Sequence, residues 1–342
     1  MRILIVSPTH KGIGGVARHV QGLVNFLKQN NCKVDVISSD NSFTIPVRKL
    51  QNPSFMLSSF LKTLLKKDYD VIHTQNFPAA LALKAAHGKK ILSLHGIHHQ
   101  QVKLLHGNTM GEISKRFEKY ALKWADVITV SSHELFEHYL KLGINAKYLP
   151  NAIDVAGLSS GIDRRYEKQI VFAGRLSKEK GILDVLTMSK KLSENIHLLI
   201  LGHGPEQQKV LKLCQEKTNV HYLGYQEQQK VIEIIRGSDI LIQPSLMEGG
   251  LSYTLMESMA CGTPIICSDA GGGKDVLDHM KNAWIIKSQN PDELYSSIIE
   301  LLNNNEKRKL LSKNGYKSAL QYDWKKIGQD YLKLYNDILN SN

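Results

Sequence analysis

Residues 170–181 read Ile170-Val171-Phe172-Ala173-Gly174-Arg175-Leu176-Ser177-Lys178-Glu179-Lys180-Gly181. The four apolar residues predict a short buried strand, and the glycine after them predicts a tight turn that leads into a helix. The turn carries Arg175, which can hold phosphate oxygens in a bidentate geometry, and Lys180, a compact positive charge beside it. We interpret the stretch as a phosphate-binding loop on an α/β unit; a solvated basic turn is the alternative.

The same alternation of short apolar runs and longer amphipathic stretches continues on both sides. The upstream runs are residues 3–6, 34–38, 71–73, 91–94, 127–130 and 148–149, and the downstream runs are 198–201, 220–223, 240–243, 264–268 and 283–286. Strands that alternate with helices favour parallel sheets. We therefore expect an α/β fold of two doubly wound, Rossmann-like domains that face each other across a cleft, with ligands beyond the carboxyl ends of the strands.

A polar stretch at 157–161 separates the two sets of strands. A chain of 342 residues with 42% apolar composition can bury two cores. We predict a first domain at 1–160 and a second at 161–317, and we expect the helical tail at 318–342 to pack back on the first domain.

Cysteine usage and the N-terminal sequence indicate a cytoplasmic protein. The four cysteines are scattered, without metal-ligand spacing, which predicts reduced thiols. The run from Met1 to Val6 is too short for a signal peptide, and no stretch approaches the roughly 20 apolar residues of a membrane span. A peripheral position on the inner face of the membrane stays open.

The net charge of +12 points to anionic partners. Residues 48–123 hold thirteen Lys or Arg against four Asp or Glu. Residues 47–67 mix apolar with basic residues, and an apolar face flanked by cations suits an anionic membrane surface or a core helix with a basic outer face. Nucleic acid would also fit the charge, but no recognition motif accompanies it, so no nucleic-acid partner is expected.

Two further stretches lie where strand-to-helix turns are expected. Gly14 and Gly15 follow the first strand, where backbone N–H groups and a helix N-terminus can approach an anion; a tight turn also needs glycine. The stretch 244–257 follows a strand, opens a helix, and carries Glu248 and Glu257, whose carboxylates can accept hydrogen bonds from sugar or ribose hydroxyls. A capped amphipathic helix is the alternative there.

With these motifs in order, the second half resembles the retaining glycosyltransferases of family 4, in the GT-B superfamily. The matching residues there are Gly174-Arg175-Leu176, Lys180-Gly181, 201–205, Leu223-Gly224, Pro244-Ser245, 248–257, 260–264 and Gly271-Gly272. The first half resembles the family more loosely, through Gly14-Gly15, 70–73, His95-Gly96, 130–132 and 149–154.

The resemblance implies a hexosyltransferase that moves a sugar from a nucleoside diphosphate to a glycan, lipid-linked or small-molecule acceptor with retention of configuration. The first domain would lie on the acceptor side and the second would bind the nucleotide sugar, in polysaccharide, lipopolysaccharide or glycolipid synthesis. Arg175 and Lys180, with Gly174, would hold the diphosphate, Glu257 the ribose, and Glu248 the donor sugar. The implied site also includes His95 near the reacting carbon, Gly14 and Gly15 at the phosphate edge, and Gly249, Gly250 and Leu251 between the glutamates.

One departure from the family pattern concerns the two glutamates. Eight residues lie between Glu248 and Glu257, one more than the pattern has. Because the extra residue falls beside Gly249 and Gly250, where glycine can absorb a bulge, we assign the sugar-binding role to Glu248. A catalytically weakened homologue that still binds the nucleotide sugar is the alternative.

No metal or cofactor is expected beyond the nucleotide-sugar co-substrate. Asp68-Tyr69-Asp70 has the metal-binding Asp-x-Asp pattern, yet it directly precedes a strand, which favours a polar strand entry. His95, His98 and His99 lack a nearby carboxylate or cysteine to complete a zinc site. The glycine spacing at 12–15 does not match the Gly-x-Gly-x-x-Gly of nicotinamide-dependent dehydrogenases.

Overall fold

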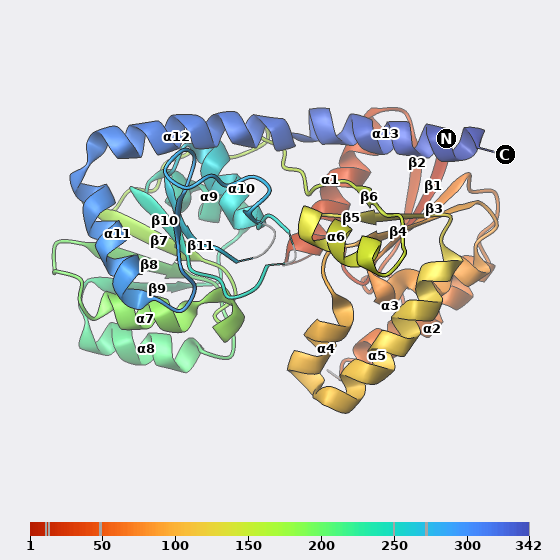
Figure 1. Cartoon of the computed structure of the whole chain (residues 1–342), viewed down its shortest axis with the longest axis horizontal. Helices are drawn as coiled ribbons and strands as arrows, with labels where there is room; N and C mark the ends of the chain where they lie inside the picture. Colours follow the sequence, from red (N-terminus) through yellow and green to blue (C-terminus); the bar gives the residue numbers. More distant parts are fainter. Residues whose placement is uncertain (11, 13, 48–49, 249, 271–272, 342) are drawn as a thin grey trace. The chain divides into compact units, whose positions relative to one another are not determined.

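The computed structural model describes residues 1–341 apart from 11, 13, 48–49, 249 and 271–272. The chain divides into two compact units, Met1–Ala152 with Asp323–Asn342, and Ile153–Tyr322. Each unit holds one six-stranded parallel sheet with helices on both faces (Figure 1). The α/β class with two doubly wound sheets is therefore confirmed.

The first unit is built on a sheet in the order β2-β1-β3-β4-β5-β6. Its strands are β1 (Arg2–Val6), β2 (Lys33–Ile37), β3 (Val71–Gln75), β4 (Lys89–Leu94), β5 (Val127–Val130) and β6 (Lys147–Tyr148). Its helices are α1 (Gly15–Gln29), α2 (Gln51–Leu64), α3 (Phe77–Ala80), α4 (His98–His106), α5 (Asn108–Ala121), α6 (His133–Lys141) and α13 (Trp324–Asn340).

Alternation along β1 explains why helices cover both faces of this sheet. Ile3 and Ile5 are fully buried in a cluster with residues of α1 and α13, whereas Leu4 and Val6 are buried in a cluster on the other face. Helix α13 packs against α1 (Figure 1), and a Cβ on Gly22 would come within 2.1 Å of Nε1 of Trp324. The returning C-terminal helix is thus part of the core of the first unit.

The second unit has the sheet order β12-β11-β10-β7-β8-β9. Its strands are β7 (Gln169–Ala173), β8 (His197–Leu201), β9 (Val220–Gly224), β10 (Ile240–Gln243), β11 (Ile265–Ser268) and β12 (Trp284–Ile286). Its helices are α7 (Ile182–Ser189), α8 (Gln207–Glu216), α9 (Gln228–Arg236), α10 (Tyr253–Cys261), α11 (Pro291–Asn303) and α12 (Asn305–Ala319).

The units divide at places that differ from the expected 160/161 and 317/318. The chain passes from one unit to the other at 152/153 and at 322/323. These two places lie together, because the N–H of Ile153 donates to the carbonyl of Tyr322 at 2.8 Å. The polar stretch 157–161 is held by α9, because Ser159 Oγ donates to Glu233 Oε1 at 3.1 Å. These contacts attach residues 153–160 and 318–322 to the second unit. Among the described residues, no helix combines the length and the apolar character needed to cross a membrane.

Candidate active site

The loops after β7 and β10 lie next to each other because these strands are neighbours in the sheet. The strands that follow β7 in the chain, β8 and β9, lie on one side of this pair, and the strands that follow β10, β11 and β12, lie on the other side. The two loops therefore flank the switch point, where doubly wound sheets bind ligands. The N–H of Leu246 donates to the carbonyl of Glu179 at 2.8 Å. Gly181 has φ +72°, and a Cβ on it would lie 1.7 Å from the carbonyl oxygen of Pro244. Only glycine allows this approach.

Lys180 and Glu248, one from each loop, form an ion pair. Lys180 Nζ lies 2.6 Å from Glu248 Oε1 and 2.7 Å from Oε2. Oε1 also accepts hydrogen bonds from Ser245 Oγ at 2.7 Å and from Gln243 Nε2 at 2.9 Å. The carboxylate of Glu248 is therefore fixed from three sides and holds the ammonium group of Lys180 at the switch point.

Arg175 stands apart from this pair. Its side chain is 55% exposed, and its Nη1 lies 3.6 Å from Oε1 of Glu179, which is also exposed. The loop beneath it is anchored, because the N–H of Gly174 donates to the carbonyl of Leu201 at 3.1 Å. An exposed guanidinium on a fixed loop can present its donors to an incoming anion.

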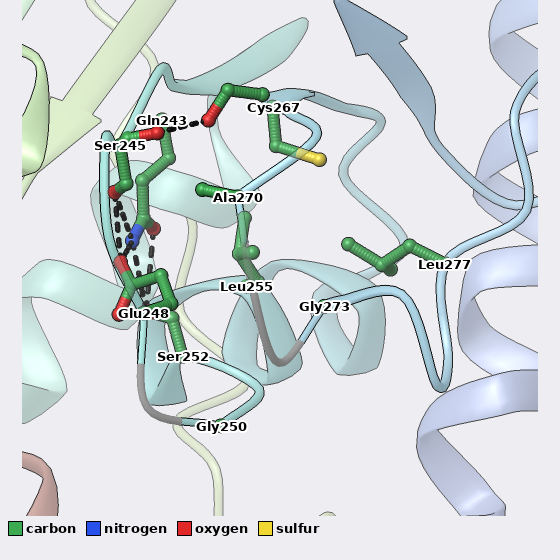
Figure 2. A pocket seen from close by; sticks show the side chains of 11 residues that line it. Gln243, Ser245, Glu248, Gly250, Ser252, Leu255, Cys267, Ala270, Gly273 and Leu277 are labelled. Atoms are coloured by element: carbon green, nitrogen blue, oxygen red, sulfur yellow. Dashed lines mark hydrogen bonds between the residues drawn. The ribbon is translucent and has the colours of Figure 1, made fainter. Parts of the chain in front are cut away.

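A small pocket opens beside Glu248, between the loops that follow β10 and β11 (Figure 2). Gln243, Glu248 and Ser252 lie on one side of it, and Cys267 and Leu277 lie on the other (Figure 2). Burial raises the pKa of the Cys267 thiol to about 12, so this group stays protonated at neutral pH. The polar side of the pocket offers hydrogen bonds, and its apolar side offers contact with a carbon skeleton.

The rest of the predicted stretch leads into α10. Gly250 and Leu251 are buried just before the helix, and Gly249 lies outside the described residues. Glu257 is fully buried on α10, and its Oε1 accepts a hydrogen bond from Gln228 Nε2 at 3.0 Å. The structure thus brings Glu248 to Lys180, while Glu257 is held separately by α9.

Gly14 and Gly15 begin α1 in the first unit. Gly14 is the N-cap residue with φ 122° and ψ 159°, and no acidic residue occupies the first turn. A positive φ of this size favours glycine. This helix start therefore carries the positive end of the helix dipole without an acidic side chain in its first turn.

His95 follows β4 at the carboxyl edge of the first sheet. Its backbone N–H donates to Asn76 Oδ1 at 2.9 Å, and its Nε2 lies 2.8 Å from Gln75 Oε1. Burial lowers the pKa of His95 to about 4, although a hydrogen bond with the Asn151 side chain opposes the shift. The ring is therefore neutral at physiological pH.

The residues considered for metal binding have other partners. Asp70 Oδ2 accepts a hydrogen bond from the N–H of Arg2 at 2.6 Å, at the entry of β3. His99 Nδ1 lies 2.8 Å from Glu118 Oε2, and the His98 ring packs against Phe77. Within the part of the chain that the structure describes, no three His, Cys, Asp or Glu side chains gather in a metal-binding arrangement.

Sequence reasoning did not single out Gln243, Ser245 and Gln75 as site residues. Gln243 and Gln75 each end a buried strand. Gln243 follows three apolar residues, and a polar side chain at that place is the signal that marks it, whereas β3 already carries His73 and Thr74, so Gln75 has no such signal. Ser245 carries no such signal, because its contact with Glu248 depends on how the loop folds.

Family models match nearly the whole chain. The model of "Glycosyl transferases group 1" matches residues 163–318, and the model of "Glycosyltransferase Family 4" matches residues 13–156. The chain is 24% identical to a phosphatidyl-myo-inositol mannosyltransferase of Mycobacterium leprae, in an alignment that covers 100% of this chain and 98% of that protein.

Solved structures share the fold. The sucrose-phosphate synthase of Thermosynechococcus elongatus superposes with a TM-score of 0.84 at 18% identity, over 100% of both chains. The Anabaena protein HepE in complex with UDP-glucose superposes with a TM-score of 0.73 at 17% identity, over 98% of this chain and 100% of that chain.

Proposed function

The chain belongs to glycosyltransferase family 4 and has the GT-B fold, and from this premise we propose that it transfers a sugar from a nucleoside diphosphate to a hydroxyl acceptor with retention of configuration. It is a glycosyltransferase of class EC 2.4. The observation that carries the proposal is the pairing of a cationic loop after β7 with a fixed carboxylate after β10, at the switch point of the second sheet.

Arg175 and Lys180 bind the diphosphate of the donor. The bond between the anomeric carbon and the phosphate oxygen breaks while the acceptor oxygen bonds to that carbon from the same face, and the acceptor proton passes to the departing phosphate. Negative charge on the diphosphate grows as the sugar leaves. Fixed cations therefore stabilise the transition state more than the bound donor, and the reaction needs no metal.

Glu248 has two tasks in this proposal. It holds Lys180 in place through a bidentate contact at 2.6 and 2.7 Å, and its other hydrogen bonds from Ser245 and Gln243 fix the carboxylate for contact with sugar hydroxyls. Because the carboxylate is already oriented, donor binding loses little side-chain entropy. The extra residue between Glu248 and Glu257 is compatible with this arrangement.

The remaining predicted residues take the roles that membership of the family implies. Glu257 binds the nucleotide ribose, and backbone groups of Gly174, Gly250 and Leu251 contact the phosphates. In the first unit, His95 contacts the donor sugar, and Gly14 and Gly15 at the start of α1 contact the phosphate edge.

The acceptor is lipid-linked or presented at an anionic membrane surface, and helix α2 supports this. Phe55, Ser59 and Thr63 form its buried face, whereas Leu57 and Leu61 on the opposite face are 58% and 51% exposed. An ordinary core helix buries its leucines and exposes its serines and threonines, whereas α2 buries Ser59 and Thr63 and exposes Leu57 and Leu61. Residues 48–123 also hold thirteen Lys or Arg against four Asp or Glu. Exposed leucines among cations suit the interface of an anionic bilayer, and the mycobacterial relative is named for a phosphatidylinositol substrate.

The donor half is tested by incubating the chain with UDP-, GDP- and ADP-sugars in EDTA and measuring release of nucleoside diphosphate. We expect release from one donor, and a product whose anomeric configuration, read by proton NMR, matches that of the donor. Inversion at the anomeric carbon, or release that requires added magnesium, contradicts the proposal.

The membrane half is tested by co-sedimentation with vesicles of phosphatidylcholine alone or mixed with phosphatidylglycerol. We expect recovery with the anionic vesicles, and loss of recovery in the Leu57→Ser/Leu61→Ser variant. Leu310→Ser is the matched control, because Leu310 is 50% exposed on α12 in the other unit. Equal recovery with both vesicle types refutes the membrane surface.

A further inference from the structure

The ion pair between Lys180 and Glu248 joins two groups to which the proposed function gives different ligands. Lys180 binds the diphosphate of the donor, and Glu248 binds the hydroxyls of its sugar. Yet Lys180 Nζ lies 2.6 Å from Glu248 Oε1 and 2.7 Å from Oε2, so each group is already the partner of the other. The donor must therefore compete with this contact for both of its members.

The ammonium group of Lys180 has little left to offer a diphosphate while the pair is closed. It has three N–H donors, and contact with both carboxylate oxygens engages two of them. Its charge is also balanced by the carboxylate of Glu248. The side chains are 27% and 11% exposed, so the pair is largely withdrawn from water and is screened less than a surface pair.

The two oxygens of Glu248 differ in how firmly the protein holds them. Oε1 also accepts hydrogen bonds from Ser245 Oγ at 2.7 Å and from Gln243 Nε2 at 2.9 Å. Among the residues that the structure describes, Oε2 has Lys180 as its one hydrogen-bond partner. Oε1 therefore stays fixed to the loop after β10, while Oε2 can exchange the ammonium group for a sugar hydroxyl.

We infer that Glu248 and the diphosphate compete for Lys180, so that the ion pair opens when the donor binds and closes when the nucleoside diphosphate leaves. The inference rests on the proposed function. The sugar of an intact donor occupies Glu248 while its diphosphate takes Lys180. Once the sugar has been transferred, Glu248 recovers Lys180 and lowers the affinity for the product. Glu248 thereby favours binding of the donor over binding of the diphosphate product, and it assists product release.

A carboxylate that only positioned Lys180 would have the opposite effect on diphosphate binding. Its removal would leave the ammonium group free to rotate, and the entropy lost on binding the diphosphate would rise. Removal of a competing carboxylate instead makes the ammonium group available. The sign of one change in affinity therefore separates competition from positioning.

The test is the affinity of the full chain for UDP, GDP and ADP in EDTA, measured by isothermal titration calorimetry for the wild type and Glu248→Gln. The nucleoside diphosphate that binds the wild type should bind Glu248→Gln about tenfold more tightly, within the usual range of coupling between two sites. Glu248→Ala should shift the affinity in the same direction, and it replaces Glu248→Gln if circular dichroism shows that variant to be misfolded. Weaker or unchanged binding overturns the inference and leaves the proposed function standing. Binding of none of the three to the wild type overturns both.

Lys180→Met supplies the matched background, because a carboxylate can also weaken diphosphate binding by direct repulsion. In Lys180→Met, the further change Glu248→Gln should alter the affinity by less than about twofold, since no ammonium group remains to be released. An equal gain in both backgrounds would assign the effect to repulsion and refute competition for Lys180.

The intact donor gives a second readout that a merely structural role would not produce. The sugar nucleotide identified by nucleotide release would be titrated without acceptor into the wild type and Glu248→Gln. The ratio of donor affinity to product affinity should fall by at least about tenfold in the variant, because its diphosphate binds more tightly while its sugar loses the carboxylate. An unchanged ratio contradicts the inference.

Discussion

The Arg175→Ala substitution should separate catalysis from stability. The Arg175 side chain is 55% exposed, and its contact with Glu179 at 3.6 Å is a surface i,i+4 pair, which contributes about 0.3–0.5 kcal/mol. The free energy of unfolding should therefore change by less than about 0.5 kcal/mol. Removing one hydrogen-bond donor from a developing oxyanion costs about 2.7–4 kcal/mol in the transition state. We expect kcat to fall by about 100- to 1,000-fold.

The assay for this variant is release of nucleoside diphosphate at saturating donor, with thermal unfolding measured in parallel. Lys178→Ala is the matched control, because Lys178 is an exposed cation in the same turn and has no assigned role. The control should keep wild-type turnover. Turnover of Arg175→Ala within twofold of the wild type, or an equal loss in Lys178→Ala, would refute the diphosphate clamp.

Three further predictions concern stability and the ion pair. Burial lowers the pKa of His73 from 6.5 to about 3, so below pH 6.5 the unfolded chain binds a proton that the folded chain does not. The free energy of unfolding should therefore be highest above pH 6.5 and should fall by about 2–3 kcal/mol by pH 4.5. Urea unfolding measures this dependence on pH, which should be weaker in His73→Gln. If the free energy of unfolding depended on pH in His73→Gln as it does in the wild type, the prediction would be wrong. Gly181→Ala should destabilise by at least about 3 kcal/mol, because its Cβ meets the backbone of Pro244, whereas Gly224→Ala, at φ +68° in open space, should cost about 1 kcal/mol; equal costs would refute the steric account. Glu248→Gln keeps the shape but removes the charge that holds Lys180, so kcat should fall about tenfold or more; wild-type turnover would assign the sugar contact elsewhere.

Much of the fold follows from local pattern. The strand predicted at 71–73 is β3 (Val71–Gln75), and the one at 283–286 is β12 (Trp284–Ile286), since buried parallel strands read as short apolar runs. Helix α2 shows the limit of such patterns. The pattern at 47–67 leaves a membrane-facing helix and a core helix both open, and only the structure shows that Phe55 is buried while Leu57 and Leu61 are exposed.

The candidate site was only partly readable from sequence. The loop at 174–181 and the stretch 244–257 could be found because each follows a strand. The contact between Lys180 and Glu248 could not, because it joins residues 68 apart and depends on β7 and β10 being neighbours. The contact at 2.7 Å between His73 Nδ1 and the Tyr335 hydroxyl joins residues 262 apart, and no local pattern in the sequence predicts it.

Donor binding in EDTA is the most direct test of the central claim. Thermal unfolding would be followed with UDP, GDP, ADP and CMP, each at high concentration, for the wild type and Arg175→Ala. A ligand at about 100 times its Kd adds about 2.7 kcal/mol, or roughly 5–10 °C for a unit of this size. The account predicts such a shift for one nucleoside diphosphate in the wild type, and a much smaller one in Arg175→Ala. No shift with any nucleotide, together with a shift on adding an oligonucleotide, would contradict it.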